Sequence, residues 1–218
     1  MSIDKKEVLR YLSYKNQYID EKLNNLIDEC IVEIKSISKP KYVYDIFNIN
    51  KDNGYILENT NFTLEGENIK EHLKDSTKCV VMVATLGSMV DYKIRYYEKI
   101  NLTKALILDA CATTYIEYIC DRIEEEIKEI ARNEGKNITF RYSPGYGDFS
   151  IEVQNNILNI LDGNKRVGVT ATESSILIPR KSVTALIGFQ IKEKKNINKC
   201  LSCNKYESCS FRHMKEIN

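Results

Sequence analysis

The alternation of apolar and polar positions along the chain predicts several helices with strands between them. In residues 20–34 and 103–133 apolar side chains recur every three or four positions, the spacing that places them on one face of an α-helix. Shorter helices are expected in three further segments, residues 4–12, 88–99 and 154–161. The helix at 103–133, which Gly135 closes, is predicted to be the spine of the fold.

Six segments have the bulky, apolar or alternating character of β-strands and are bounded by turn residues. They are residues 42–47, 55–57, 79–86, 138–141, 167–172 and 183–190. The run at 79–86 is continuously apolar, which is typical of a buried strand. We therefore expect one α+β domain, in which an antiparallel or mixed sheet packs with long helices. Its parts are an N-terminal helical cap (1–38), an α+β core (39–192) and a cysteine-containing tail (193–218).

Composition and charge narrow the class of protein. A chain of 218 residues with 43% hydrophobic and 29% charged side chains can bury its own core. The formal net charge of +1 gives no reason to expect nucleic acid as a partner. The first residues are charged where a signal peptide is apolar, and no run approaches the roughly 18 apolar residues of a membrane span. These features predict a cytoplasmic protein whose core cysteines are reduced.

The segment from Arg141 to Tyr146, which reads RYSPGY, is the clearest chemical signal in the core. An arginine can hold a carboxylate through two parallel hydrogen bonds, and a tyrosine ring can stack on a flat base. Gly145 between them would let a ligand approach the backbone. The same residues would also suit a plain type II turn with a solvated arginine, so both interpretations stay open.

The tail contains four soft metal ligands within fourteen positions, Cys200, Cys203, Cys209 and His213. A Cys3His set completes the tetrahedral shell of a zinc ion, and Cys-x-x-Cys also occurs around iron–sulfur clusters. Two alternatives remain, a redox-active pair of cysteines and a tail in which the cysteines are incidental. The sequence therefore predicts a zinc or iron–sulfur site here without deciding between them.

The RYSPGY segment, with Thr172-Glu173-Ser174, Lys181-Ser182-Val183 and the helix 105–123, resembles the activation domain of cobalamin-dependent methionine synthase. The similarity covers roughly residues 79–190, and the terminal cysteines resemble those of stand-alone relatives of that domain. This family binds S-adenosylmethionine and, with an electron from reduced flavodoxin, returns oxidised cobalamin to its methylated form. The resemblance implies an accessory protein for a methionine synthase or another corrinoid protein that carries the cobalamin, with a flavodoxin-like electron donor.

The resemblance also implies a set of ligand-binding residues. Arg141 would hold the methionyl carboxylate, Ser143 and Gly145 would offer backbone groups to the adenosine, and Tyr146 would line the pocket. Glu117 matches a helix carboxylate that reaches the ligand, although from its own position it could equally be a solvated helix residue. No protein nucleophile is required, because the cofactors carry the chemistry.

Glu173 lies between two hydroxyl side chains and could face the pocket or the partner's corrin, or belong to a turn or helix cap. Two features of the family are missing here, an aspartate-containing first segment and a tyrosine in the last strand, where Ile187 stands. They favour an alternative function, a corrinoid-binding, chaperone or redox module with a metal-binding tail and no S-adenosylmethionine.

Overall fold

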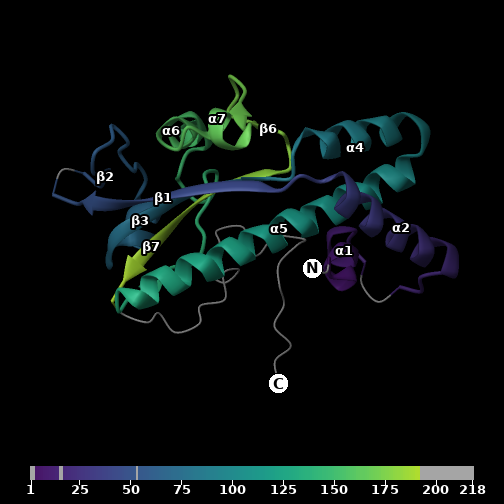
Figure 1. Ribbon diagram of the computed structural model, residues 1–218, viewed down its shortest axis with the longest axis horizontal. Helices are drawn as coiled ribbons and strands as arrows, with labels where there is room; N and C mark the ends of the chain where they lie inside the picture. The colour runs from purple at the N-terminus through teal and green to yellow at the C-terminus, as the bar shows by residue number, and fades with distance from the viewer. Residues whose placement is uncertain (1–2, 15–16, 53, 192–218) are drawn as a thin grey trace.

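A five-stranded antiparallel sheet separates two layers of helices in this computed structural model, which describes residues 3–14, 17–52 and 54–191 (Figure 1). The helices are α1 (Lys5–Tyr11), α2 (Glu21–Ile37), α3 (Glu67–Leu73), α4 (Ser88–Ile100), α5 (Leu102–Asn133), α6 (Gln154–Ile160) and α7 (Gly163–Val167). The strands are β1 (Lys41–Asn50), β2 (Ile56–Leu57), β3 (Ser76–Thr85), β4 (Asn137–Ile138), β5 (Thr170–Ala171), β6 (Leu177–Ile178) and β7 (Ser182–Gln190). The predicted α+β class, with a sheet packed against long helices, is confirmed.

The sheet has the order β2-β1-β3-β7-β4, and β3 lies at its centre. Successive side chains of β3 point to opposite faces, so Met82 enters one core and Val81 and Val83 enter the other. All three are fully buried. A strand covered on both faces needs an unbroken apolar sequence, which is why the run at 79–86 predicted this strand correctly.

Helix α5 forms the first layer together with α1, α2 and α4. Its apolar stripe, which includes Leu108, Cys111 and Ile123, packs against the sheet and against Ile27 and Ile34 of α2. Asn101 begins the helix, since its side chain accepts the Lys104 N–H at 3.1 Å. Because Leu108 is fully buried, truncating it to alanine would cost about 2–5 kcal/mol of unfolding free energy.

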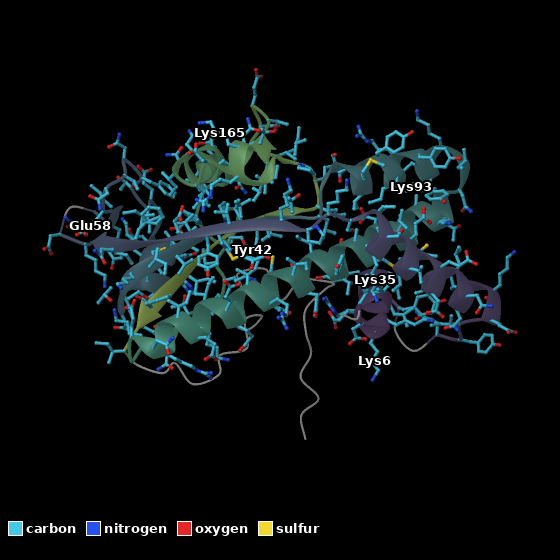
Figure 2. The ribbon with its side chains drawn as sticks, in the orientation of Figure 1. Lys6, Lys35, Tyr42, Glu58, Lys93 and Lys165 are labelled. Atoms are coloured by element: carbon cyan, nitrogen blue, oxygen red, sulfur yellow. The ribbon has the colours of Figure 1, made fainter. Side chains whose placement is uncertain are left out.

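The second layer consists of α3, α6, α7 and the short β5–β6 hairpin. Figure 1 shows α6, α7 and β6 on the opposite side of the sheet from α5. Its core contains Ile69, Phe149, Ile157 and Leu161. On the α5 side, Tyr42 lies between β1 and the helix (Figure 2), and its hydroxyl donates to Glu126 at 3.0 Å.

Three local predictions were wrong or incomplete. Helix α3 was not predicted, because no capping side chain precedes it in the sequence: it follows Gly66, and its first N–H groups are bound by Asp148 from a distant segment. Residues 167–172 are not one strand: α7 ends at Val167, Gly168 follows with φ +76°, and only Thr170–Ala171 pair with β6. The strand expected at 138–141 ends at Ile138, because the Thr139 side chain, instead of a carbonyl, accepts the Gly188 N–H at 2.8 Å.

Candidate functional site

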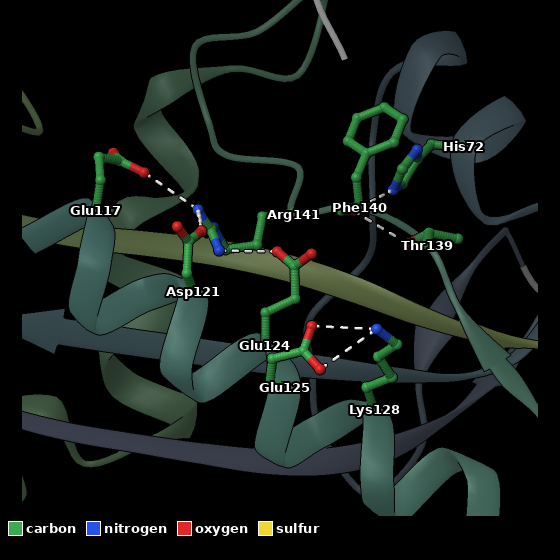
Figure 3. A network of polar contacts seen from close by, with 9 residues as sticks. All are labelled: His72, Glu117, Asp121, Glu124, Glu125, Lys128, Thr139, Phe140 and Arg141. Carbon is green, nitrogen blue, oxygen red and sulfur yellow. Dashed lines mark hydrogen bonds and ion pairs between the residues drawn. The ribbon is translucent and has the colours of Figure 1, made fainter. Parts of the chain in front are cut away.

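Arg141 joins the edge of the sheet to helix α5 (Figure 3). Its Nη1 donates to Glu124 Oε2 at 2.8 Å. Its Nη2 donates to Asp121 Oδ1 at 2.8 Å and to Glu117 Oε2 at 3.1 Å. The three carboxylates belong to successive turns of α5, so a single guanidinium can reach all of them.

Burial and charge distinguish the four members of this cluster, which we call the Arg141 cluster (Arg141, Glu117, Asp121 and Glu124). The Arg141 side chain is 12% exposed and that of Glu124 is 19% exposed, whereas Asp121 is 67% exposed. Burial alone would lower the pKa of Arg141, but the negative charges of Glu124 and Asp121 outweigh it and raise that pKa. Arg141 therefore stays protonated, and three carboxylates around one guanidinium leave the cluster with a formal charge of −2.

The backbone segment that carries Arg141 is held on its other side by α3. His72 Nε2 lies 3.0 Å from the carbonyl oxygen of Phe140, and because a carbonyl can only accept, this nitrogen donates (Figure 3). The His72 ring also packs against Phe140 and Tyr142 at centroid distances of 4.5 and 4.9 Å. Arg141 is thus presented to α5 from a segment with a defined position.

The turn that follows Arg141 is closed by its own backbone. The Gly145 N–H donates to the Phe149 carbonyl at 2.7 Å, and the Tyr146 N–H donates to the Ser143 carbonyl at 3.3 Å. Gly145 has φ +91°, a conformation that glycine adopts without strain. These contacts already occupy one backbone group each of Ser143 and Gly145, the residues expected to serve the adenosine.

Two features leave this turn open to a ligand. A side chain added at Gly145 would meet no heavy atom within 4 Å. Tyr146 is 53% exposed, and its ring centroid lies 6.3 Å from that of Tyr142. A flat group could therefore reach the Tyr146 ring without displacing the core.

Asp148 fastens the turn to the start of α3. Its carboxylate accepts the Glu67 N–H at 2.7 Å and the Asn68 N–H at 3.0 Å. These hydrogen bonds, with the Asn68 bond as the largest contribution, lower the pKa of Asp148. The carboxylate accordingly acts as the cap of α3, and the turn is anchored at both ends.

The edge of β7 that faces β4 and the turn is unpaired at the N-terminal end of the strand, in the part of the chain that the structure describes. Tyr142 bridges to Leu186, and among the described residues no strand pairs with 182–185 on that side. At the start of β7, Lys181 Nζ contacts Asp109 Oδ1 at 2.9 Å and Thr113 Oγ1 at 2.8 Å. Lys181 and the Arg141 cluster therefore mark a polar stripe on α5 that follows this edge: Asp109, Thr113, Glu117, Asp121 and Glu124.

Glu173 lies apart from the Arg141 cluster. It is exposed in the turn of the β5–β6 hairpin, and strand β6 lies on the side of the sheet away from α5 (Figure 1). Within the described part of the chain, no hydrogen bond or ion pair joins it to the cluster. Thr172 Oγ1 lies 3.0 Å from Ser174 Oγ and accepts the Ile176 N–H at 3.1 Å, so this segment serves as a turn.

The metal ligands expected in the tail, Cys200, Cys203, Cys209 and His213, lie outside the described residues. Within residues 3–14, 17–52 and 54–191, no group of three His, Cys, Asp or Glu side chains is arranged to hold a metal ion. The same ranges contain no helix that is long and apolar enough to cross a membrane.

The sequence interpretation missed Asp121 and Glu124. Their spacing from Glu117, four and then three residues along α5, was a usable signal, because it puts three carboxylates on one helix face. A lone acidic stripe is ordinarily solvated, however, and only the fold reveals that Arg141 lies against it.

Comparison with known proteins locates the fold but not the family. No protein-family model matches the sequence, and no curated protein matches it. Among solved structures, the chain is similar to the crystal structure of the MetH reactivation domain bound to AdoHcy, with a TM-score of 0.59 and 15% sequence identity. The similarity covers 85% of this chain and 73% of that one. The chain thus has the fold of the MetH reactivation domain.

Proposed function

We propose that this protein binds S-adenosylmethionine and supports the reductive methylation of cobalamin on a methionine synthase or a related corrinoid methyltransferase. The observation that carries the proposal is its fold, shared with a reactivation domain whose structure holds AdoHcy. The RYSPGY segment lies at the edge of the sheet, and its arginine is held against α5. Because one fold can serve many functions, the ligand is inferred from the residues at this edge.

The Arg141 cluster fits the amino-acid end of S-adenosylmethionine. Arg141 would bind the carboxylate after exchanging one of its present partners, and Asp121, which is 67% exposed, can rotate into solvent with the least loss. The formal charge of −2 in the cluster suits the α-ammonium and the sulfonium of the ligand. The half-exposed ring of Tyr146 offers a face for the adenine.

The protein's contribution would be to position the ligand. S-adenosylmethionine supplies an electrophilic methyl group, and the cobalamin that accepts it belongs to the partner. The residues of this chain hold the carboxylate, balance the positive charges and orient the adenosine at the sheet edge. A flavodoxin-like protein is the electron donor in this proposal.

One observation favours the second candidate, a corrinoid-binding or redox module that takes no S-adenosylmethionine. Arg141 is already paired with three carboxylates, and the Ser143 carbonyl and the Gly145 N–H are bonded inside the turn. A ligand would have to displace some of these contacts, which costs binding free energy.

Calorimetric titration with S-adenosylmethionine separates the two candidates. We expect saturable binding in the micromolar range, about 8 kcal/mol, and a loss of at least about tenfold in affinity for Arg141→Lys, which keeps the charge but not the forked donor. Arg132→Lys is the matched control, because Arg132 belongs to α5, the helix that Arg141 contacts, and among the described residues it pairs with Glu129, with both side chains more than half exposed. A folded wild-type chain that shows no heat of binding would refute the proposal and leave the second candidate.

A further inference from the structure

The outer edge of β1 is open along most of its length. β3 covers the inner edge of β1 from Lys41 to Asn48 without a break in register. On the outer edge, within the described residues, β2 pairs only with Ile49 and Asn50. The segment 41–47 is thus a strand with one unpaired side, and Figure 1 shows it running between α7 and α5.

The backbone groups at this edge point outward in a regular pattern. The Asn48 carbonyl accepts the Glu58 N–H at 3.0 Å, so Asn48 faces away from β3. Both backbone groups of a residue point to the same side, and the side alternates along a strand. Tyr42, Tyr44 and Ile46 therefore also present an N–H and a C=O to the open edge.

Side chains on both faces of β1 border this edge. On the α5 side, the hydroxyls of Tyr42 and Tyr44 donate to the two carboxylate oxygens of Glu126 at 3.0 and 2.9 Å. On the α7 side, Arg166 Nη1 pairs with Asp45 Oδ2 at 2.7 Å. A cavity of about 460 Å³ lies here, lined by Tyr42, Val43, Tyr44 and Arg166.

The protection of this edge strand is incomplete: Lys41 lies at its first residue and Asp45 is paired with Arg166, but nothing interrupts the strand between them. Natural edges are interrupted by proline, a bulge or inward-pointing charge, or are covered by another element. Between Lys41 and Phe47 there is no proline, and the pairing with β3 has no bulge. Tyr42 is 46% exposed and Ile46 is 37% exposed, so apolar surface accompanies the free backbone groups.

We propose that this edge pairs with the β1 strand of a second copy of the chain, antiparallel about a two-fold axis at Tyr44. The free segment 41–47 has Tyr44 at its midpoint, so this register gives the longest overlap. It sets Tyr44 opposite Tyr44 of the second copy and Tyr42 opposite Ile46. The two central sheets then form one continuous sheet.

Charge complementarity supports a second copy over an unrelated strand. In this register Lys41 of one copy lies diagonal to Asp45 of the other, on the same face of the sheet, where opposite charges attract. The exposed Tyr42 of each copy also covers the exposed Ile46 of the other copy, so this contact occurs once on each side of the axis. Such an interface is isologous, because both copies contribute the same surface.

Sedimentation velocity on the full chain tests the proposal. We expect a dimer in the micromolar range that Ile46→Lys weakens by at least about tenfold, because a lysine at an edge opposes pairing. Val32→Lys is the matched control, since Val32 is 68% exposed on α2, away from β1. Thermal unfolding of both variants verifies that they fold. A chain that stays monomeric, or a dimer that the two variants weaken equally, overturns the proposal.

Oxidative cross-linking tests the register. Tyr44→Cys places two cysteines opposite each other on the axis, within the Cα distance of about 4.4–6.8 Å that a disulfide allows. Tyr42→Cys leaves its two copies about four residues apart, more than about 13 Å along the strand. We expect a covalent dimer for Tyr44→Cys above the wild-type background and none for Tyr42→Cys. The reverse pattern overturns the proposed pairing.

Discussion

Replacing Arg141 by methionine should destabilise the protein strongly, because it removes the charge that three carboxylates share. Methionine keeps a long apolar stem, so the change tests the guanidinium more than the packing. The pair with Glu124 is the important one, since both side chains are less than one-fifth exposed, at 12% and 19%. Breaking a largely buried, charge-assisted hydrogen bond costs about 1.5–3 kcal/mol.

The other two pairs add less. Glu117 is 43% exposed and Asp121 is 67% exposed, so solvent screens both interactions, which contribute about 0–1 kcal/mol each. The expected loss in the free energy of unfolding is therefore about 1.5–5 kcal/mol at pH 7 and low ionic strength. Urea denaturation measures it directly, and the same slope of free energy against urea in both proteins would show that only stability has changed.

Arg132→Met provides the comparison. Arg132 pairs with Glu129 at 2.6 Å, but the two side chains are 54% and 64% exposed. We expect that variant to lose no more than about 0.5 kcal/mol. If Arg141→Met cost as little as Arg132→Met, the Arg141 cluster would be a surface ion pair, and the reasoning that α5 and the sheet edge are joined there would be refuted.

Three further predictions concern other parts of the fold. Burial opposes ionisation of Glu33, but the hydrogen bonds and charges of Lys104 and Lys93 outweigh it and lower the pKa of Glu33. The ionised Glu33 therefore stabilises the fold above its unfolded pKa of about 4.3, and this stabilisation is lost as the pH falls through the lower folded pKa. Glu33→Gln should therefore reduce the free energy of unfolding by about 1 kcal/mol at pH 7, and the difference from wild type should shrink below about pH 4 in urea titrations; an equal difference at both pH values would contradict this. Burial raises the pKa of the Cys79 thiol to about 12, so mass spectrometry after iodoacetamide at about pH 8 should find this cysteine unmodified in the folded chain and modified after unfolding, and rapid labelling of the native protein would show that the strand opens. Gly147→Ala should destabilise by about 2–3 kcal/mol in thermal unfolding, more than Gly135→Ala at about 1 kcal/mol, because both have positive φ but only the first places a Cβ against Asn68 and 2.8 Å from the Tyr142 hydroxyl; equal losses would show that the turn yields.

The sequence predicted best the elements in which the local pattern of apolar residues matches the pattern of burial. Helix α5 was expected at 103–133 and spans Leu102–Asn133, because an apolar side chain returns to the core at every turn. Strand β3 was expected from an unbroken apolar run and is covered on both faces. In both cases the local pattern and the tertiary environment agree.

The elements that were missed depend on contacts between distant segments. Helix α3 begins after Gly66 and is capped by Asp148, which lies about eighty positions away in the sequence. Residues 167–172 contain two buried valines. This pattern fits a strand, but it fits equally well a short helix that is followed by a turn. Neither arrangement could be read from a local window.

The candidate site shows the same division. Arg141 and Glu117 were predicted together, and the structure brings them within 3.1 Å of each other. From the sequence, each of the two side chains was expected to contact a ligand. In the structure they contact each other. The tertiary pairing also recruits Glu124, and it leaves Glu173 in the other layer, where the sequence offered no means of placing it.

The central claim is tested most directly by a single-turnover methyl-transfer experiment under anaerobic conditions. The full chain, S-adenosylmethionine and a reductant are mixed with a methionine synthase fragment that carries oxidised cobalamin but lacks its own reactivation domain. We predict that methylcobalamin forms, that its formation requires both the chain and S-adenosylmethionine, and that Arg141→Lys slows it while Arg132→Lys does not. Formation at the same rate without the chain, or with Arg141→Lys at the wild-type rate, would contradict the account.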